Sequence, residues 1–103
     1  MEYSNDYTYL GTKLKYRLEI EAGGFSMLND NFEVDIIRGP NVLHFTKYQC
    51  ELGEDKNWYV CFDTKDLGVG RITAKVTAFV PDTDYPGGVR KEVQRLDLIP
   101  VRG

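Results

Sequence analysis

Apolar and polar residues alternate with a period of two along much of this chain. The pattern is clearest over residues 13–22, 32–38 and 71–80, where every second position is apolar with few exceptions. Successive side chains of a β-strand point to opposite faces, so each segment predicts a strand with one buried and one solvated face. The stretch around residues 71–80 is the longest uninterrupted signal, and we expect it to form the centre of one sheet.

Three further segments predict strands from weaker patterns. Residues 42–52 alternate poorly and suggest a strand that is broken in two. Residues 58–63 carry apolar atoms on both faces, which favours a central strand or one that lies under a loop. Residues 89–99 form the last expected strand, and their pairing with residues 71–80 would make a long hairpin. Glycine, proline and asparagine punctuate the segments, as turns require.

This arrangement predicts an all-β fold. Strands recur about every ten residues with turn signals between them, and no segment keeps a helical period. We expect an antiparallel β-sandwich of about seven strands, with a small β-barrel such as an OB-fold as the alternative. A single helical turn capped by Asp63 or Thr64 is expected after the strand 58–63. Leu67, which follows that turn, is predicted to anchor the core.

The length of 103 residues suits one domain. Residues 13–100 are expected to form it, because the strand signals begin and end there. The polar, tyrosine-rich residues 1–12 are interpreted as a loose lead-in, and residues 101–103 as a tail.

Charge and hydropathy narrow the classes of partner. The formal net charge of −3 and the pI of about 5.1 argue against nucleic acid, since nucleic-acid binders usually carry a basic surface. No apolar run approaches the length of a membrane span, and the first residues lack the features of a secretory signal. We therefore expect a soluble protein that is cytoplasmic at synthesis, with no membrane partner.

Two cysteines are too few for a disulfide scaffold. Both Cys50 and Cys61 lie in predicted strands, so we interpret them as buried free thiols. Pairing across neighbouring strands is the alternative, and it would need an oxidising compartment.

No residue pattern in the chain predicts catalysis, a metal site or a cofactor. His44 is the only histidine, and no nucleophile motif accompanies it. Asp82 and Asp84 have a spacing that calcium ligands can use, but the EF-hand pattern is absent. Aspartates in loops usually hydrogen-bond to their own backbone. We therefore predict a protein that is not an enzyme and that binds neither metal nor cofactor.

The stretch from Asp63 to Gly70, followed by an alternating strand, resembles the step into a late strand of immunoglobulin-like sandwiches. Together with residues 32–38, 58–63 and 80–90, it is similar to small uncharacterised proteins of gut Bacteroidetes and their prophages. It also resembles, more loosely, N-terminal modules of phage tail and baseplate proteins. The chain departs from antibody domains, because Cys50 and Cys61 are too close in sequence for an inter-sheet disulfide around a core tryptophan.

The resemblance implies a non-enzymatic structural or interaction module, of a phage or prophage virion, with protein partners. Its contacts would come from loops at one end of the sandwich or from an edge strand that adds to a partner sheet. Within the chain, the loop 81–88 is the predicted contact region, with Asp82, Asp84 and Tyr85 in it and Arg90 just beyond. Arg90, Lys91, Glu92 and Arg95 charge the final strand, which leaves the oligomeric state open.

The alternative function is a glycan-binding immunoglobulin-like module of a gut bacterium. It would use aromatic side chains exposed at the surface, namely Trp58 or a tyrosine such as Tyr48, Tyr59 or Tyr85. Trp58 alternates with Val60 and Phe62, however, and this spacing favours a place in the core. Burial of Trp58 therefore discriminates between the two functions.

Overall fold

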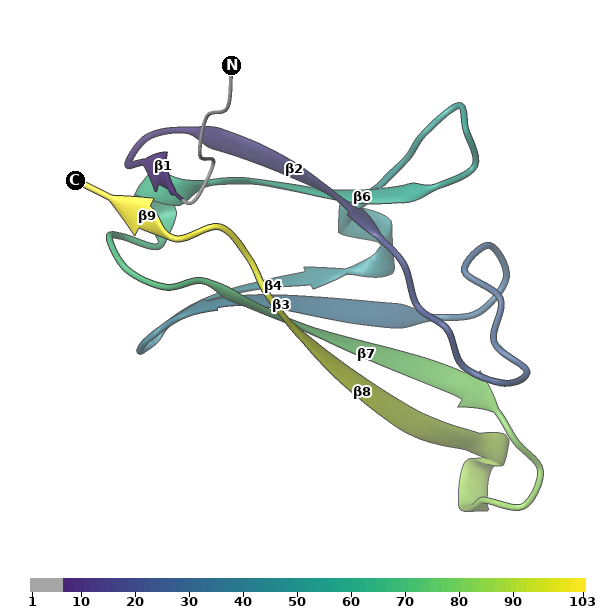
Figure 1. The fold of residues 1–103 in the computed structure, drawn as a ribbon. Helices are drawn as coiled ribbons and strands as arrows, with labels where there is room; N and C mark the ends of the chain where they lie inside the picture. Colours follow the sequence, from purple (N-terminus) through teal and green to yellow (C-terminus); the bar gives the residue numbers. More distant parts are fainter. Residues whose placement is uncertain (1–6) are drawn as a thin grey trace.

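The computed structural model describes residues 7–103, which form two antiparallel sheets packed face to face (Figure 1). The first sheet has the strand order β2 (Lys13–Leu18), β6 (Trp58–Asp63), β5 (Glu51–Leu52). The second has the order β4 (Asn41–Thr46), β3 (Phe32–Arg38), β7 (Thr73–Pro81), β8 (Val89–Asp97). The predicted all-β sandwich is confirmed, and the sheets do not close into a barrel.

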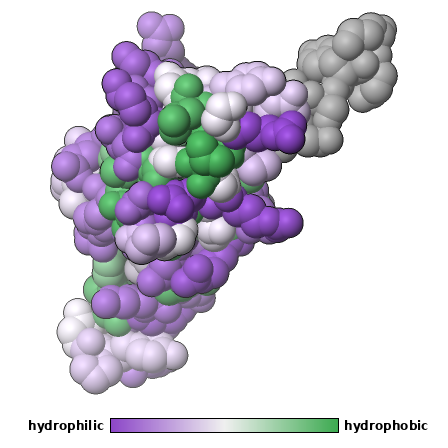
Figure 2. Space-filling view, turned by 90° about the vertical axis from the view of Figure 1, so that its left-hand side faces the viewer, coloured by the Kyte–Doolittle hydropathy of each residue, from purple (hydrophilic) through white to green (hydrophobic). Residues whose placement is uncertain are grey.

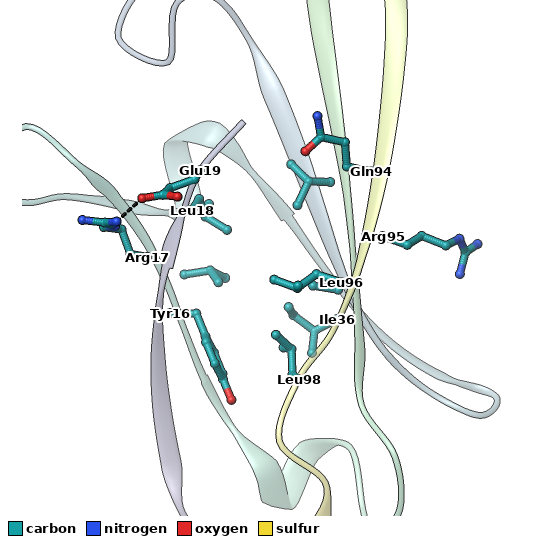
Figure 3. Close-up of a pocket in the computed structure, with 12 residues that line it drawn as sticks. Tyr16, Arg17, Leu18, Glu19, Ile36, Gln94, Arg95, Leu96 and Leu98 are labelled. Carbon is teal, nitrogen blue, oxygen red and sulfur yellow. Dashed lines mark hydrogen bonds and ion pairs between the residues drawn. The ribbon is translucent and has the colours of Figure 1, made fainter. Parts of the chain in front are cut away.

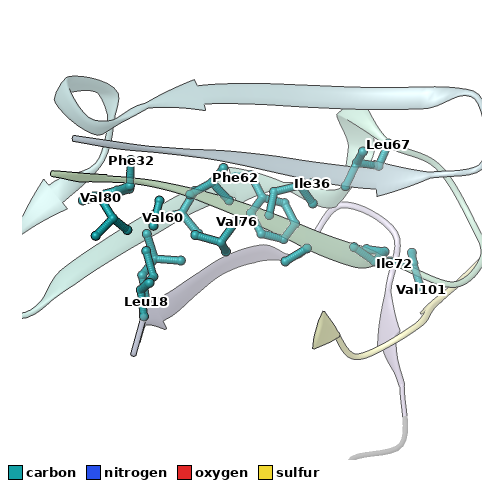
Figure 4. Close-up of a cluster of buried hydrophobic side chains, with 14 residues drawn as sticks. Leu18, Phe32, Ile36, Val60, Phe62, Leu67, Ile72, Val76, Val80 and Val101 are labelled. Atoms are coloured by element: carbon teal, nitrogen blue, oxygen red, sulfur yellow. The ribbon is translucent and has the colours of Figure 1, made fainter. Parts of the chain in front are cut away.

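The core lies between the sheets and is built by the alternation seen in the sequence (Figure 4). Phe32, Val34 and Ile36 of β3 have no exposed surface, while the residues between them are half-buried. The strand β7 alternates in the same way over its buried positions. Burial of each large apolar side chain stabilises the fold by roughly 1.5–3 kcal/mol, so this shared inner face is the main source of stability.

The strand β7 lies inside its sheet, between β3 and β8, as expected. Its pairing with β8 runs from Thr73 opposite Asp97 to Pro81 opposite Val89, which confirms the long hairpin. The strand β6 is the central strand of the smaller sheet, between β2 and β5.

The predicted break within residues 42–52 is confirmed. The 3-10 turn η1 (Lys47–Gln49) separates β4 from β5. The side chain of Gln49 accepts a hydrogen bond from the backbone N–H of Thr46 at 2.8 Å, which closes the turn. This turn directs Lys47 into the protein, where only 6% of its surface is exposed.

The capped turn after β6 is also confirmed. It is η2 (Thr64–Asp66), and the Asp63 carboxylate accepts a hydrogen bond from the Lys65 N–H at 2.9 Å. Leu67 follows and is buried. The buried Thr64 hydroxyl accepts from the Gly11 N–H and donates to the Thr12 carbonyl, both at 2.9 Å. These bonds attach the start of the chain to the sandwich.

The two ends of the chain differ from the expected lead-in and tail. The strand β1 (Thr8–Tyr9) pairs in parallel with β9 (Val101–Arg102), and Val101 belongs to the buried core. The Thr8 N–H donates to the Pro100 carbonyl at 2.8 Å. A pair of two-residue strands is too short to show alternation, so the sequence pattern could not reveal it. The remainder of the predicted lead-in, residues 1–6, lies outside the described residues.

Two predicted strands end earlier than expected. The segment 13–22 is strand only as far as Leu18, although Ile20 beyond it is still buried. The segment 89–99 ends its pairing with β7 at Asp97. In both places the chain leaves the sheet before the apolar alternation stops.

Candidate functional site

The predicted contact loop connects β7 to β8 and contains the short turn η3 (Pro86–Gly88). The Asp82 carboxylate accepts hydrogen bonds from the Asp84 N–H at 3.0 Å and from the Arg90 guanidinium at 2.7 Å. Arg90 also donates to the Gly23 carbonyl at 3.0 Å. Asp82 and Arg90 thus hold the loop in shape and attach it to the turn after β2.

The other two predicted residues are directed to solvent. Asp84 is exposed, and half of the Tyr85 surface is accessible. The structure therefore divides the four predicted site residues into a buttress, Asp82 with Arg90, and an exposed pair, Asp84 with Tyr85. Contact with a partner through this loop stays a prediction, and it rests on the exposed pair.

The buttress makes stability depend on pH. The hydrogen bond from the Asp84 N–H and the adjacent Arg90 lower the pKa of Asp82 below its ordinary value. A carboxyl with a lowered folded-state pKa stabilises the fold above its unfolded pKa, near 3.9, and loses that contribution as pH falls through the folded value. We expect Asp82→Asn to lower the melting temperature at pH 7 and to leave it close to wild type at pH 2.

Thermal unfolding followed by circular dichroism between pH 2 and pH 7 measures this difference. Asp84→Asn is the matched control, because only the backbone of Asp84, and not its carboxylate, bonds to Asp82 in the described structure. If the melting temperatures of Asp82→Asn and the wild type differ by the same amount at every pH, the role of the buttress is contradicted.

The described residues 7–103 contain no group of three or more His, Cys, Asp or Glu side chains placed to hold a metal ion. His44 lies on the outer face of the four-stranded sheet, opposite Asp35 in the β3–β4 register. Its Nδ1 is 2.6 Å from Asp35 Oδ1, and its Nε2 is 3.9 Å from Glu33 Oε1. No hydroxyl or thiol within residues 7–103 hydrogen-bonds to this imidazole. The arrangement is a cross-strand polar pair, and it lacks a nucleophile.

Both cysteines are free thiols, as expected from the sequence, but they are not equally buried. Cys50 is half-buried, whereas Cys61 is exposed on the outer side of β6. Cys61 is therefore a correction to the expected buried pair: it lies on the solvated face of the alternation. Its thiol donates to the Glu51 carboxylate at 3.1 Å.

The different surroundings predict different reactivity of the two thiols. Burial raises the pKa of Cys50 to about 11, with a smaller contribution from Cys61. Burial and Glu51 also raise the pKa of Cys61, but that side chain is open to solvent. Since the thiolate is the reactive form, we expect iodoacetamide at pH 8 to modify Cys61 at least about fivefold faster than Cys50. Peptide mass spectrometry over a time course measures both rates, and faster modification of Cys50 would contradict this.

Trp58 occupies the expected core position at the start of β6. Its ring is half-buried and stacks edge-to-face on Phe32, with ring centroids 5.7 Å apart. The Lys47 Nζ lies 5.2 Å from the centre of the indole. The indole N–H is buried and has no hydrogen-bond partner among the described residues. Trp58 therefore packs against the core and does not present its N–H to a ligand.

The sequence pattern did not reveal an open side of the sandwich, between β2 and β8 (Figure 3). These are the edge strands of the two sheets. Tyr16 and Leu18 of β2 point into the space from one side, and Leu96 and Leu98 from the other. The space has a volume of about 410 Å³, and its floor reaches core residues such as Ile36. We call it the β2–β8 groove.

Leu96 is the most unusual side chain of the groove. It lies opposite Ala74 in the β7–β8 register and shares the inner face with that buried residue. Nevertheless, 62% of its surface is exposed. Arg95, next to it, points away from the groove (Figure 3). An inward-facing leucine is exposed here because no strand of the smaller sheet lies opposite β8.

Both strands that flank the groove also have a free backbone edge. Next to the β7–β8 ladder, the Leu98 N–H donates to the Ile72 carbonyl, and next to the β2–β6 ladder, the Thr64 N–H donates to the Thr12 carbonyl. These two bonds determine which residues of each edge strand bond to the neighbouring strand and which do not. Because antiparallel partners alternate, Arg95 and Asp97 of β8 direct their backbone N–H and C=O groups away from β7. Lys15 and Arg17 of β2 direct theirs away from β6 for the same reason.

Two hydrogen bonds between the sheets delimit the groove along its length. At one end the Gln94 side chain donates to the Glu21 carbonyl at 3.1 Å. At the other the Ile99 N–H donates to the Tyr16 hydroxyl at 3.4 Å. The groove is thus an elongated opening, bounded by these two bonds, with an apolar floor and unpaired strand edges as walls.

A second apolar area lies at the end of the molecule that carries β1 and β9. Hydrophobic side chains gather there and are surrounded by hydrophilic ones (Figure 2). Leu10 and Val69, from the connections at this end, are each about half exposed.

Neither a scan against protein-family models nor searches of curated proteins and solved structures returned a match to this chain. Within residues 7–103, no helix has the length and apolar character needed to cross a membrane. The assignment of function therefore depends on the geometry of the fold.

Proposed function

We propose that this protein is a non-enzymatic interaction module that binds a protein partner along the β2–β8 groove. The exposure of Leu96 on the inner face of the sandwich supports this proposal most directly. Its burial by a partner would remove further apolar surface from water and so favour binding. The free edges of β2 and β8 offer backbone hydrogen bonds to the same partner, as in recognition by strand addition.

We further propose that the sandwich is immunoglobulin-like. If β2 corresponds to strand B, the three-stranded sheet has the order B–E–D and the four-stranded sheet the order C′–C–F–G. The parallel pair of β1 with β9 would then join an early strand to the end of strand G. This connectivity supports the immunoglobulin-like part of the resemblance. On the resemblance alone, we propose a component of a phage or prophage virion as the partner.

The glycan-binding alternative gains little support from the aromatic residues. Trp58 is half-buried and packs against Phe32 and Lys47, so less of its ring is available for stacking on a sugar. Tyr48 and Tyr85 are exposed on different elements, η1 and the loop before β8. A lone exposed tyrosine is common on protein surfaces.

Site-specific photo-crosslinking tests the proposed function. A photoreactive amino acid placed at Leu96 is expected to give a covalent adduct with one protein partner in the native host. The same amino acid at Val93, which is on the outer face of β8 and similarly exposed, is the control. Adducts of equal yield at both positions, or none at Leu96, would contradict binding along the groove.

A further inference from the structure

We propose that the β2–β8 groove takes an extended segment of a partner protein, in which apolar residues alternate with acidic ones. The segment adds to β2 as a fourth strand of the smaller sheet. This inference rests on the proposed function and specifies the chemistry of the partner.

The position of the segment follows from the unequal width of the sheets. The larger sheet has four strands and the smaller has three, and the difference lies at the β2–β8 side. A strand added beside β2 would bond to the free backbone groups of Lys15 and Arg17. Its inward side chains would meet Leu96 and Leu98, so they are apolar.

The free edge of β2 suits one short strand. The strand β2 has six residues, Lys13–Leu18. At roughly 3.4 Å per residue this edge is about 20 Å long, the length of a typical strand.

The charge of the β2 edge specifies the outward side chains of the segment. Lys13, Lys15 and Arg17 alternate along the solvated face of β2. The Lys15 Nζ is 3.7 Å from the Glu51 Oε2, and Arg17 forms an ion pair with Glu19. Lys13 has no ion pair within residues 7–103. Directly opposed side chains of neighbouring strands lie about 5 Å apart, where opposite charges attract. Acidic residues on the outward face of the segment would therefore complement this edge, although the whole chain is acidic.

Titration with synthetic peptides, followed by amide NMR shifts, tests the inference. The probe is a seven-residue peptide of alternating glutamate and valine with blocked ends. We expect its shifts to concentrate at Lys15, Arg17 and Leu96. A peptide of alternating lysine and valine is expected to bind at least about tenfold more weakly. A peptide with the glutamates and valines in separate blocks should also bind at least about tenfold more weakly.

Paired variants locate the binding. Leu96→Glu should weaken binding of the glutamate–valine peptide at least about tenfold, whereas Val93→Glu should leave it unchanged. Both side chains are exposed, so neither substitution removes a buried contact. No binding, equal binding of the lysine peptide, or equal effects of the two variants would overturn the inference.

Two further outcomes keep this inference separate from the proposed function. A concentration-dependent dimer in sedimentation that Leu96→Glu abolishes would assign the groove to a second copy and overturn the acidic segment. If position 96 crosslinks to a partner but the glutamate–valine peptide does not bind, the proposed chemistry of the segment is overturned. The proposed function as an interaction module remains supported in that case.

Discussion

Replacement of Phe32 by alanine is expected to lower the free energy of unfolding by about 3–5 kcal/mol, the range for loss of a buried phenylalanine. Phe32 is fully buried at the start of β3. Its ring stacks edge-to-face on Trp58 and lies 5.8 Å from the Lys47 Nζ. Truncation would leave a cavity and remove the surface against which two neighbouring side chains pack.

Urea unfolding followed by far-ultraviolet circular dichroism measures this loss without depending on the Trp58 environment. Phe79→Ala is the matched control, since Phe79 is half-buried on the outer face of β7 beneath Lys91. We expect the control to lose about 1 kcal/mol, because it leaves no closed cavity. Equal losses from the two variants would show that the inner face between the sheets is not the main core.

Replacement of Lys47 by methionine is expected to lower the free energy of unfolding by about 2–4 kcal/mol. The Lys47 Nζ donates to the carbonyls of Leu28 and Asp30, both at 2.9 Å. Hydrogen bonds from a charged donor contribute roughly 1.5–3 kcal/mol each, and the variant leaves both carbonyls without this donor. Methionine retains most of the stem that packs against Phe32 and Trp58.

The same urea measurement applies, with Lys65→Met as the control. Lys65 is exposed on η2, so its replacement should change stability by less than about 0.5 kcal/mol. Faster amide exchange in the segment 25–31 should accompany the loss in Lys47→Met, because that segment depends on the two hydrogen bonds. Wild-type stability of Lys47→Met would contradict a structural role for this buried charge.

Much of the fold could be predicted because its strands are long enough to show their period. The strands β2, β3 and β7 each expose one face and direct the other inward, and this alternation is visible in the sequence. The cap on η2 and the anchor at Leu67 could be predicted because capping is a local interaction between residues close in the chain.

Other features depend on contacts between distant residues and have no local signal. The parallel pair of β1 with β9 joins the two ends of the chain through strands of two residues each. From the sequence alone, Lys47 would be expected in solvent. The burial of its side chain follows only from the direction of η1. The alternation of apolar and polar residues therefore identifies the inner face of a strand, but it does not show which element covers that face.

The candidate site shows the same limit. The sequence identified the loop 81–88 by its unusual composition, but it could not separate the buttress of Asp82 and Arg90 from the exposed Asp84 and Tyr85. The pairing of β8 with β7 places Leu96 opposite Ala74, on the inner face. Only the arrangement of the sheets shows that no strand covers it.

Amide hydrogen exchange in the free protein, resolved by NMR, is the most direct test of the open side. We expect rapid exchange at Arg17 and Arg95, whose N–H groups face the free edges. We expect slow exchange at Tyr16 and Leu96, whose N–H groups bond to β6 and β7. Equal protection of all four amides would show that the edges of β2 and β8 are already paired, and it would contradict a groove that is open to a partner.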